Sequence, residues 1–329
     1  MELRQVVGPL PPADRGAVLA LAARAAVADG VAPLDEAALL ALTPDPAPTA
    51  PTPATPPTTH LLASEQVGAL PHTSSDVAEG VVGYLQVDRG GQAATAQLVV
   101  DPAARRHGIG RALLDEAVAA GTTEAWAHGD LPAAGALAAA AGWEPVHRLW
   151  RMGLDLPGRP RVGADPPVGF VVRHFVPGHD EAAWLAVNAR AFADHADQGR
   201  WTAADLAARE REPWFDPAGF LLAERAGRLA GFAWTKVHPP GDLAPEAVGE
   251  LYVLGIDPAA QGLGLGRALT AAALDALAAR GLATATLWVA GDNAAAIGTY
   301  RRAGFVRTAL DVRYAVGATR SPAGAFMGS

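Results

Sequence analysis

The sequence predicts an α/β protein of two tandem domains, each a mixed, mostly antiparallel sheet flanked by helices. Two of its stretches are nearly identical: residues 101–113 read DPAARRHGIGRAL and residues 257–269 read DPAAQGLGLGRAL. Each stretch follows an apolar run of strand type and opens an Ala- and Leu-rich segment, which is the order strand, tight turn, helix. Because 329 residues are enough for two hydrophobic cores, we interpret the repeat as two copies of one domain.

In the first half, apolar periodicity predicts helices over 12–29 and 34–42. Residues 43–59 are almost entirely Pro, Ala and Thr, so we expect an extended loop there. The remaining elements predicted in this half are strands at 60–65, 80–88 and 94–101, a helix at 109–120, and helix, turn and strand within 131–146.

The second half repeats that order after a Pro- and Gly-rich linker at 156–169. Its predicted elements are a strand at 170–175, a helix at 180–192, two strands within 220–237, a strand at 249–257, a helix at 264–280, a strand at 284–291, a helix at 293–304 and a strand at 305–316. We therefore expect domains at 1–155 and 170–316, followed by a loose tail at 317–329.

Composition excludes several classes of protein. A net charge of −8 argues against a general nucleic-acid binder, and the absence of cysteine excludes disulfides, thiolate metal ligands and a cysteine nucleophile. The nine histidines are scattered, with no pair at H-x-x-x-H spacing, so we expect no metal site. No uncharged apolar run approaches the roughly 18–20 residues of a spanning helix, and the N-terminus lacks a signal-peptide core. We expect a cytoplasmic monomer that binds neither nucleic acid nor membrane.

The repeated turn suits a phosphate ligand. Its pattern is Arg105-x-x-Gly108-x-Gly110 in the first copy and Gln261-x-x-Gly264-x-Gly266 in the second. A strand-to-helix turn presents free backbone N–H groups and the positive end of the helix dipole, and glycines let a ligand approach closely. An ordinary strand–helix turn remains the alternative, more so for the first copy than for the second.

The second half resembles the GNAT N-acetyltransferases. Their pattern is strand, Q/R-x-x-G-x-G/A turn, helix, strand and N-x-x-A-x-x-x-Y-x-x-x-G-F, and here GELYVLGIDPAAQGLGLGRAL and DNAAAIGTYRRAGF carry it. The phrases AFADHADQGRWT, FAWTKVH and GELYVLGIDP are similar to the mycothiol synthases, a family of two-domain GNAT enzymes. That resemblance covers the chain apart from 43–59 and the tail. It implies that acetyl-CoA is the co-substrate and that the acceptor is the cysteinyl amine of cysteinyl-glucosaminyl-inositol, a small amino-sugar thiol.

The resemblance also implies the groups that move protons. Glu250, at the start of the strand before the second turn, matches the base that takes the amine proton, and Tyr300 matches the acid that protonates the leaving thiolate. A surface ion pair for Glu250 and plain packing for Tyr300 remain the alternatives. The implied coenzyme A contacts are Leu254, Gly255, Ile256, Gln261, Gly262, Leu263, Gly264, Leu265, Gly266, Arg267 and Asn293 in the second copy, and Leu98, Val99, Val100, Arg105, Arg106, His107, Gly108, Ile109, Gly110 and Arg111 in the first.

The acceptor contacts that the resemblance implies have competing structural explanations. They are Glu36, Glu181, Lys236, Glu250 and Trp288. Glu36 and Glu181 each lie in the first turn of a predicted helix, where an acid favours the dipole in any case. Lys236 has the alternative of a solvated strand end, and Trp288, which replaces the family's Tyr, has the alternative of core packing. The stretch HPPGDLAPEAVG before Glu250 is four residues longer than the family leads us to expect, which alters the acceptor cleft.

The first copy lacks the implied proton-transfer groups. Aligning Asp101 with Asp257 places Ala94 opposite Glu250, and aligning Gly142 with Gly304 places Ala138 opposite Tyr300. We therefore expect a first domain that can bind acetyl-CoA but does not catalyse. Two further functions remain open: a GNAT enzyme for another amine, such as a peptide N-terminus or an aminoglycoside, and a non-catalytic acyl-CoA-binding protein.

Overall fold

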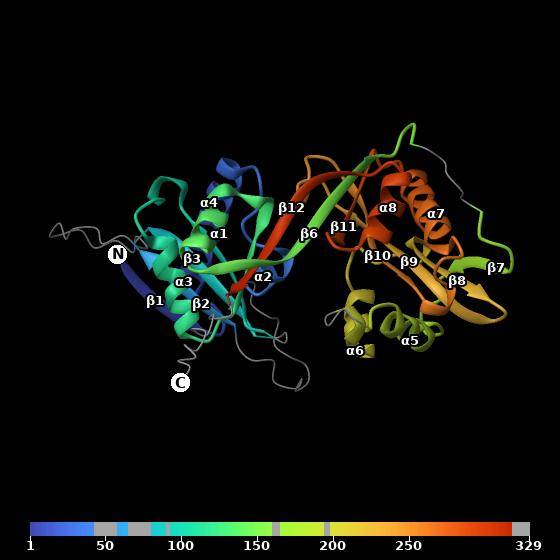
Figure 1. Cartoon of the computed structure of the whole chain (residues 1–329), viewed down its shortest axis with the longest axis horizontal. Coiled ribbons are helices and arrows are strands. Elements are labelled where there is room, and N and C mark those ends of the chain that lie inside the picture. Colours follow the sequence, from blue (N-terminus) through green and yellow to red (C-terminus); the bar gives the residue numbers. More distant parts are fainter. Residues whose placement is uncertain (43–57, 65–79, 90–92, 160–164, 194–197, 318–329) are drawn as a thin grey trace, which may run out of the picture. The chain divides into compact units, whose positions relative to one another are not determined.

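The computed structural model describes residues 1–42, 58–64, 80–89, 93–159, 165–193 and 198–317. The loop predicted at 43–59 lies outside these ranges except for its last two positions, and the tail does so after residue 317. The chain forms two compact units, Met1–Arg148 with Leu310–Ser329, and Leu149–Ala309 (Figure 1).

The first unit is a mixed sheet with helices on both faces. Its strand order is β1-β2-β3-β4-β5-β12-β6, with β4 and β5 parallel. The strands are β1 (Glu2–Val7), β2 (Thr59–Ser64), β3 (Val81–Asp88), β4 (Thr95–Val100), β5 (Glu124–Ala127), the first part of β6 (Trp143–Asp155) and the last part of β12 (Val306–Val316). The helices are α1 (Pro12–Asp29), α2 (Glu36–Leu40), α3 (Ile109–Ala119) and α4 (Pro132–Ala140).

Two apolar layers hold this unit together. Helix α1 buries a stripe with helical spacing, Val18, Leu21, Ala22 and Ala25, and this stripe packs with α2 on one face of β2–β4. Helix α3 packs on the other face, where alternate residues of the same strands point.

The second unit repeats the arrangement. Its strand order is β12-β6-β11-β10-β9-β8-β7, with β10 and β11 parallel. Besides parts of β6 and β12, its strands are β7 (Phe170–His174), β8 (Phe220–Arg225), β9 (Arg228–His238), β10 (Val248–Ile256) and β11 (Thr284–Ala290). Its helices are α5 (Glu181–Ala191), α6 (Ala203–Glu210), α7 (Leu265–Ala279) and α8 (Ala294–Arg302), with α7 and α8 on the face opposite α5 and α6 (Figure 1).

The units divide the chain differently from the expected ranges 1–155 and 170–316. Residues Leu149–Asp155 pair with β11, so the end of β6 belongs to the second unit. Conversely, Val312–Ala315 of β12 pair with β5, so the end of β12 belongs to the first. The reason is that β6 and β12 are 13 and 11 residues long, about twice the usual strand length, and each contributes residues to both units.

Candidate active site

The two parallel strands of the second unit stop pairing at Glu250. Strands β10 and β11 form three pairs, Val248–Thr284, Gly249–Ala285 and Glu250–Thr286, whereas β10 goes on pairing with β9 as far as Ile256. In the described sheet, the edge of β10 after Glu250 therefore has no partner strand on the β11 side. Backbone amides and carbonyls at such an edge are free to bind an extended ligand.

A β-bulge at Tyr252 sets the direction of the side chains beside this opening. The register with β9 shifts between Leu251 and Val253, so Tyr252 is the extra residue. As a result Leu251 faces the core under α7, while Val253 faces the aromatic cluster under α5 and α6.

Glu250 lies on the α5 and α6 face, within a group of polar side chains. It is paired directly with Lys236 of β9, and the two residues are only 7% and 5% exposed. The Nζ atom of Lys236 lies 4.9 Å from the ring centre of Trp214, a cation–π distance. His238, two residues along β9 on the same face, places its Nε2 2.7 Å from Oε2 of Glu250.

Trp288 shares this face as well. Since Thr286 is the parallel partner of Glu250, Trp288 follows it by two residues on β11 and points the same way. A hollow of about 570 Å³ begins beside Thr286. It is lined by polar side chains of three strands and by the β9–β10 connection: Arg151, Asp155, Thr284, Thr286, Thr308 and Leu243.

Tyr300 lies on the opposite face. It is 8% exposed, on the last turn of α8, and packs with Leu251, Leu287 and Phe305 in the core. Burial raises the pKa of its hydroxyl to about 12, so the phenol stays protonated at neutral pH and is a weaker acid than an exposed tyrosine. Glu250 and Tyr300 thus face opposite sides of the sheet at the strands between which pairing ends.

The second glycine turn has the free amides that a pyrophosphate needs. Gly264 caps α7 with φ +84° and Gly262 has φ +75°, both in the left-handed region. Among the described residues, no hydrogen bond is donated by the six amides of residues 262–267, and the next amide, Ala268, bonds back to Gly264. These amides and the α7 dipole fit a phosphate group of coenzyme A.

The first copy reproduces this turn closely. Gly108 caps α3 with φ +82°, and the described residues give no acceptor for the six amides of 106–111. In both copies an aspartate binds the following turn and an arginine from the first helix of its unit: Asp101 with Arg24, and Asp257 with Arg190.

The two turns differ at one strained position. Arg106 has φ +69°, where the second copy has Gly262 in open space. A non-glycine residue in this region costs about 1–2 kcal/mol. We expect Arg106→Gly to raise the free energy of unfolding by up to about 1 kcal/mol, after the added entropy of glycine in the unfolded chain. We expect Gly262→Arg to lower it by about 1–2 kcal/mol. Urea midpoints measure both, with Arg106→Asn as an intermediate control; a destabilised Arg106→Gly would contradict the argument.

The first copy has no carboxylate where Glu250 stands. We count the strand pairs backwards from the equivalent aspartates, Asp101 and Asp257. The sixth pair of β4 with β3 is then Thr95–Asp88, and the sixth pair of β10 with β9 is Glu250–Lys236. The hydrogen bonding therefore places Thr95 opposite Glu250, one residue from the Ala94 of an ungapped alignment, because β4 lacks the bulge. Neither residue is a base.

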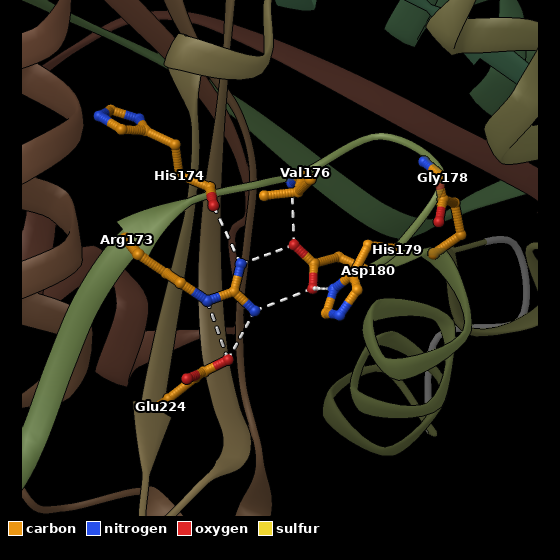
Figure 2. A network of polar contacts seen from close by, with 8 residues as sticks. Arg173, His174, Val176, Gly178, His179, Asp180 and Glu224 are labelled. Atoms are coloured by element: carbon orange, nitrogen blue, oxygen red, sulfur yellow. Dashed lines mark hydrogen bonds and ion pairs between the residues drawn. The ribbon is translucent and has the colours of Figure 1, made fainter.

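An ion-pair network anchors α5 (Figure 2). The Arg173 guanidinium donates to both oxygens of Asp180 and to Glu224. The Asp180 side chain, 3% exposed, also accepts from the Val176 amide. Hydrogen bonds from Arg173 hold the pKa of Asp180 well below its usual range.

The remaining predicted acceptor residues lie at helix starts. Glu181 begins α5 and accepts a hydrogen bond from the Gly178 amide. Burial first, and then the nearby charge of Glu181, raise the pKa of Glu210 at the end of α6, so two carboxylates approach each other there. Glu36 begins α2, which Asp35 caps through the Ala38 amide. Asn293, a predicted coenzyme A contact, caps α8 through the Ala296 amide.

Comparison with known proteins agrees with this geometry. The acetyltransferase (GNAT) family model matches residues 186–305, and a second GNAT domain model matches residues 72–144. The mycothiol acetyltransferase of Cellulomonas flavigena is 50% identical over 98% of this chain and 91% of its own length. That of Sanguibacter keddieii is 48% identical over 95% and 96%. The chain belongs to the mycothiol acetyltransferase family.

Solved structures support the fold of this family member. A GCN5-related N-acetyltransferase from Sphaerobacter thermophilus superposes with a TM-score of 0.67 at 20% identity, covering 94% of both chains. A tandem GNAT protein from the clavulanic acid biosynthesis pathway gives 0.62 at 20% identity, covering 97% of this chain and 100% of that one. The prediction of two tandem GNAT domains in an acetyltransferase is therefore confirmed. Within the described ranges, no helix is long and apolar enough to cross a membrane.

One residue of the site was missed by the sequence-based reasoning. His238 was considered only as a possible metal ligand, among nine scattered histidines. A usable signal was present, since His238 follows Lys236 by two residues and therefore shares its face of the strand.

Proposed function

We propose that the protein transfers the acetyl group of acetyl-CoA to the cysteinyl amine of cysteinyl-glucosaminyl-inositol. The observation that supports this most directly is the place of Glu250. It is a buried carboxylate at the last pair of two parallel strands, and the same strand ends in a turn with six free amides. Strand β10 and the turn that follows it therefore carry both the proposed base for the acceptor amine and the proposed phosphate site for acetyl-CoA.

In the proposed mechanism the second unit alone carries the chemistry. Glu250 takes the proton from the acceptor ammonium, and the free amine attacks the thioester carbonyl. The carbon–sulfur bond then breaks, and the coenzyme A thiolate takes the proton of the Tyr300 hydroxyl. The second proton of the attacking nitrogen, which is lost as the amide forms, restores the Tyr300 hydroxyl. Residues 262–267 hold the pyrophosphate, and the open edge of β10 at Leu254–Ile256 orients the thioester.

The acceptor is proposed to extend from Glu250 into the hollow lined by Arg151, Asp155 and Thr284. Its volume of about 570 Å³ lies in the range of small-molecule sites. Three threonines and three charged residues, Arg151, Asp155 and Arg159, line the hollow and offer the donors and acceptors that a polyol needs. Leu243, from the connection that is longer than expected, lines the same hollow, so this connection shapes the acceptor site.

The first unit is proposed to bind acetyl-CoA without catalysing transfer. Its turn has the same cap and the same free amides as the second. It lacks the bulge, and Thr95 stands at the position of the base.

The test is acetyl-CoA consumption by the purified protein with cysteinyl-glucosaminyl-inositol, beside a cysteine amide that lacks the sugar and inositol. We expect turnover with both and a much higher kcat/KM with the full acceptor. Tyr300→Phe should lower kcat and leave acetyl-CoA affinity unchanged. Coenzyme A binding without turnover of either amine would refute this acceptor and direct the search to other amines.

A further inference from the structure

A buried histidine, His238, contacts the proposed base Glu250 and has no role in the mechanism proposed above. His238 Nε2 lies 2.7 Å from Glu250 Oε2, and both side chains are only 9% exposed. This distance is that of a strong hydrogen bond between a charged and a neutral group or between two charged groups. The contact of His238 is with Oε2, one of the two carboxylate oxygens of Glu250.

We propose that His238 is the positioning residue and proton exit of Glu250. It holds Oε2, so that Oε1 faces the acceptor amine, and it carries the proton that Glu250 takes on to the surface. This inference rests on the proposed role of Glu250 as the base.

The surroundings of His238 explain why an exit is needed. Glu250 is 7% exposed before any acceptor is present, so direct proton loss to water is hindered further while substrate covers the site. His238 connects the buried carboxylate of Glu250 with the solvent, because its Nδ1 lies 3.9 Å from Oδ2 of Asp242, whose side chain is 55% exposed. The second ring nitrogen thus faces an acid in contact with solvent.

The proton balance is complete within these groups. Glu250 takes one proton from the acceptor ammonium and passes it to Nε2 of His238, and the imidazolium loses a proton from Nδ1 to water beside Asp242. The ionisable groups that face His238 are Glu250 of β10, Asp242 of the β9–β10 connection and, on its own strand, Lys236. This leaves the ring proton on Nε2, and exchange of ring protons with water restores the Nδ1–H tautomer, and with it the starting state, before the next turnover.

The decisive variants are His238→Ala and His238→Gln, with His174→Gln as the matched control. His174 is an exposed histidine of the same unit, on the edge strand β7, whereas His238 lies on the inner strand β9. We expect His238→Ala to lower kcat by at least about tenfold, the low end of effects on proton transfer. Acetyl-CoA affinity should stay at the wild-type value.

The His238→Gln variant separates the two proposed roles of His238, positioning the Glu250 carboxylate and transporting its proton. Its amide can donate to Glu250 but cannot transport a proton, so we expect kcat of His238→Gln to stay low. Imidazole added to the buffer should raise kcat of His238→Ala and not that of His238→Gln. Full kcat in His238→Gln, or an unchanged kcat in His238→Ala, would overturn the proposal.

One readout does not depend on the acceptor. The ring ¹⁵N signals of His238, assigned by their loss in His238→Gln, should shift in Glu250→Gln, whereas those of His174 should not. Unmoved His238 signals would overturn the contact itself. Failure of the wild type to acetylate cysteinyl-glucosaminyl-inositol, by contrast, would count against the proposed function, and the His238 variants would be compared with any amine that the protein does acetylate.

Discussion

Replacing Glu250 by glutamine is expected to lower kcat/KM for acetyl transfer by about 10²–10⁴-fold at neutral pH, the usual contribution of a general base. Glutamine keeps the size of the side chain and a carbonyl oxygen for His238, but it cannot take a proton from the acceptor ammonium. Acetyl-CoA affinity should be unchanged, because the turn at residues 262–267 is formed by backbone amides. Steady-state kinetics with calorimetric titration of acetyl-CoA measure the two quantities.

The matched control for this variant is Glu246→Gln. Glu246 is an exposed glutamate of the β9–β10 connection, four residues before Glu250, and should retain wild-type kinetics. A Glu250→Gln protein that turns over within threefold of the wild type would show that another group takes the amine proton.

Replacing Asp180 by alanine is expected to lower the free energy of unfolding by about 3 kcal/mol, the low end for breaking a buried ion pair. The change leaves the Arg173 guanidinium without its two-oxygen partner and the Val176 amide without an acceptor. Arg173 is 32% exposed, and water compensates part of the loss. Chemical unfolding followed by the fluorescence of Trp184, which is buried on α5, measures the effect on this unit.

Asp115→Ala is the control for Asp180→Ala. The Asp115–Arg111 pair is exposed on α3, so its loss should cost only about 0.3–0.5 kcal/mol.

The pH dependence of stability follows from the lowered pKa of Asp180. Its stabilising contribution is complete above the unfolded-state pKa of about 3.9 and is lost as pH falls below it, so the wild type should lose more stability between pH 5 and pH 3 than Asp180→Ala. Parallel curves would contradict this account.

Local patterns were enough to predict most of the fold. The glycine turns, the helices after them and the paired strands each carry their own signal within about fifteen residues, and all appear where expected. Strands β1 and β5 were not predicted. The residues of β1, ELRQVV, show no strict alternation and are mostly exposed, and β5 is only four residues long. Helix α6 was not predicted either, although Thr202 and Asp205 form a capping box that signals its start.

Features that depend on pairing between distant segments could not be predicted. The bulge at Tyr252 changes which residue of the first copy matches Glu250, and an ungapped alignment cannot show it. The contact of His238 with Glu250 spans twelve residues and a loop of unusual length, so spacing alone does not predict it. The roles of Glu36, Glu181 and Trp288 toward the acceptor remain predictions.

The long strands β6 and β12 have a consequence for how this gene can be dissected. A cut anywhere in 156–169 leaves the first fragment without Leu310–Val316, which lies beside β5, and the second without Leu149–Asp155, which lies beside β11. Each fragment would expose a sheet edge that its own sequence cannot cover, and such edges promote aggregation. Although the sequence is a duplication, neither half of the reading frame encodes an autonomous domain, and the fragments can regain their complete sheets only when both are made together.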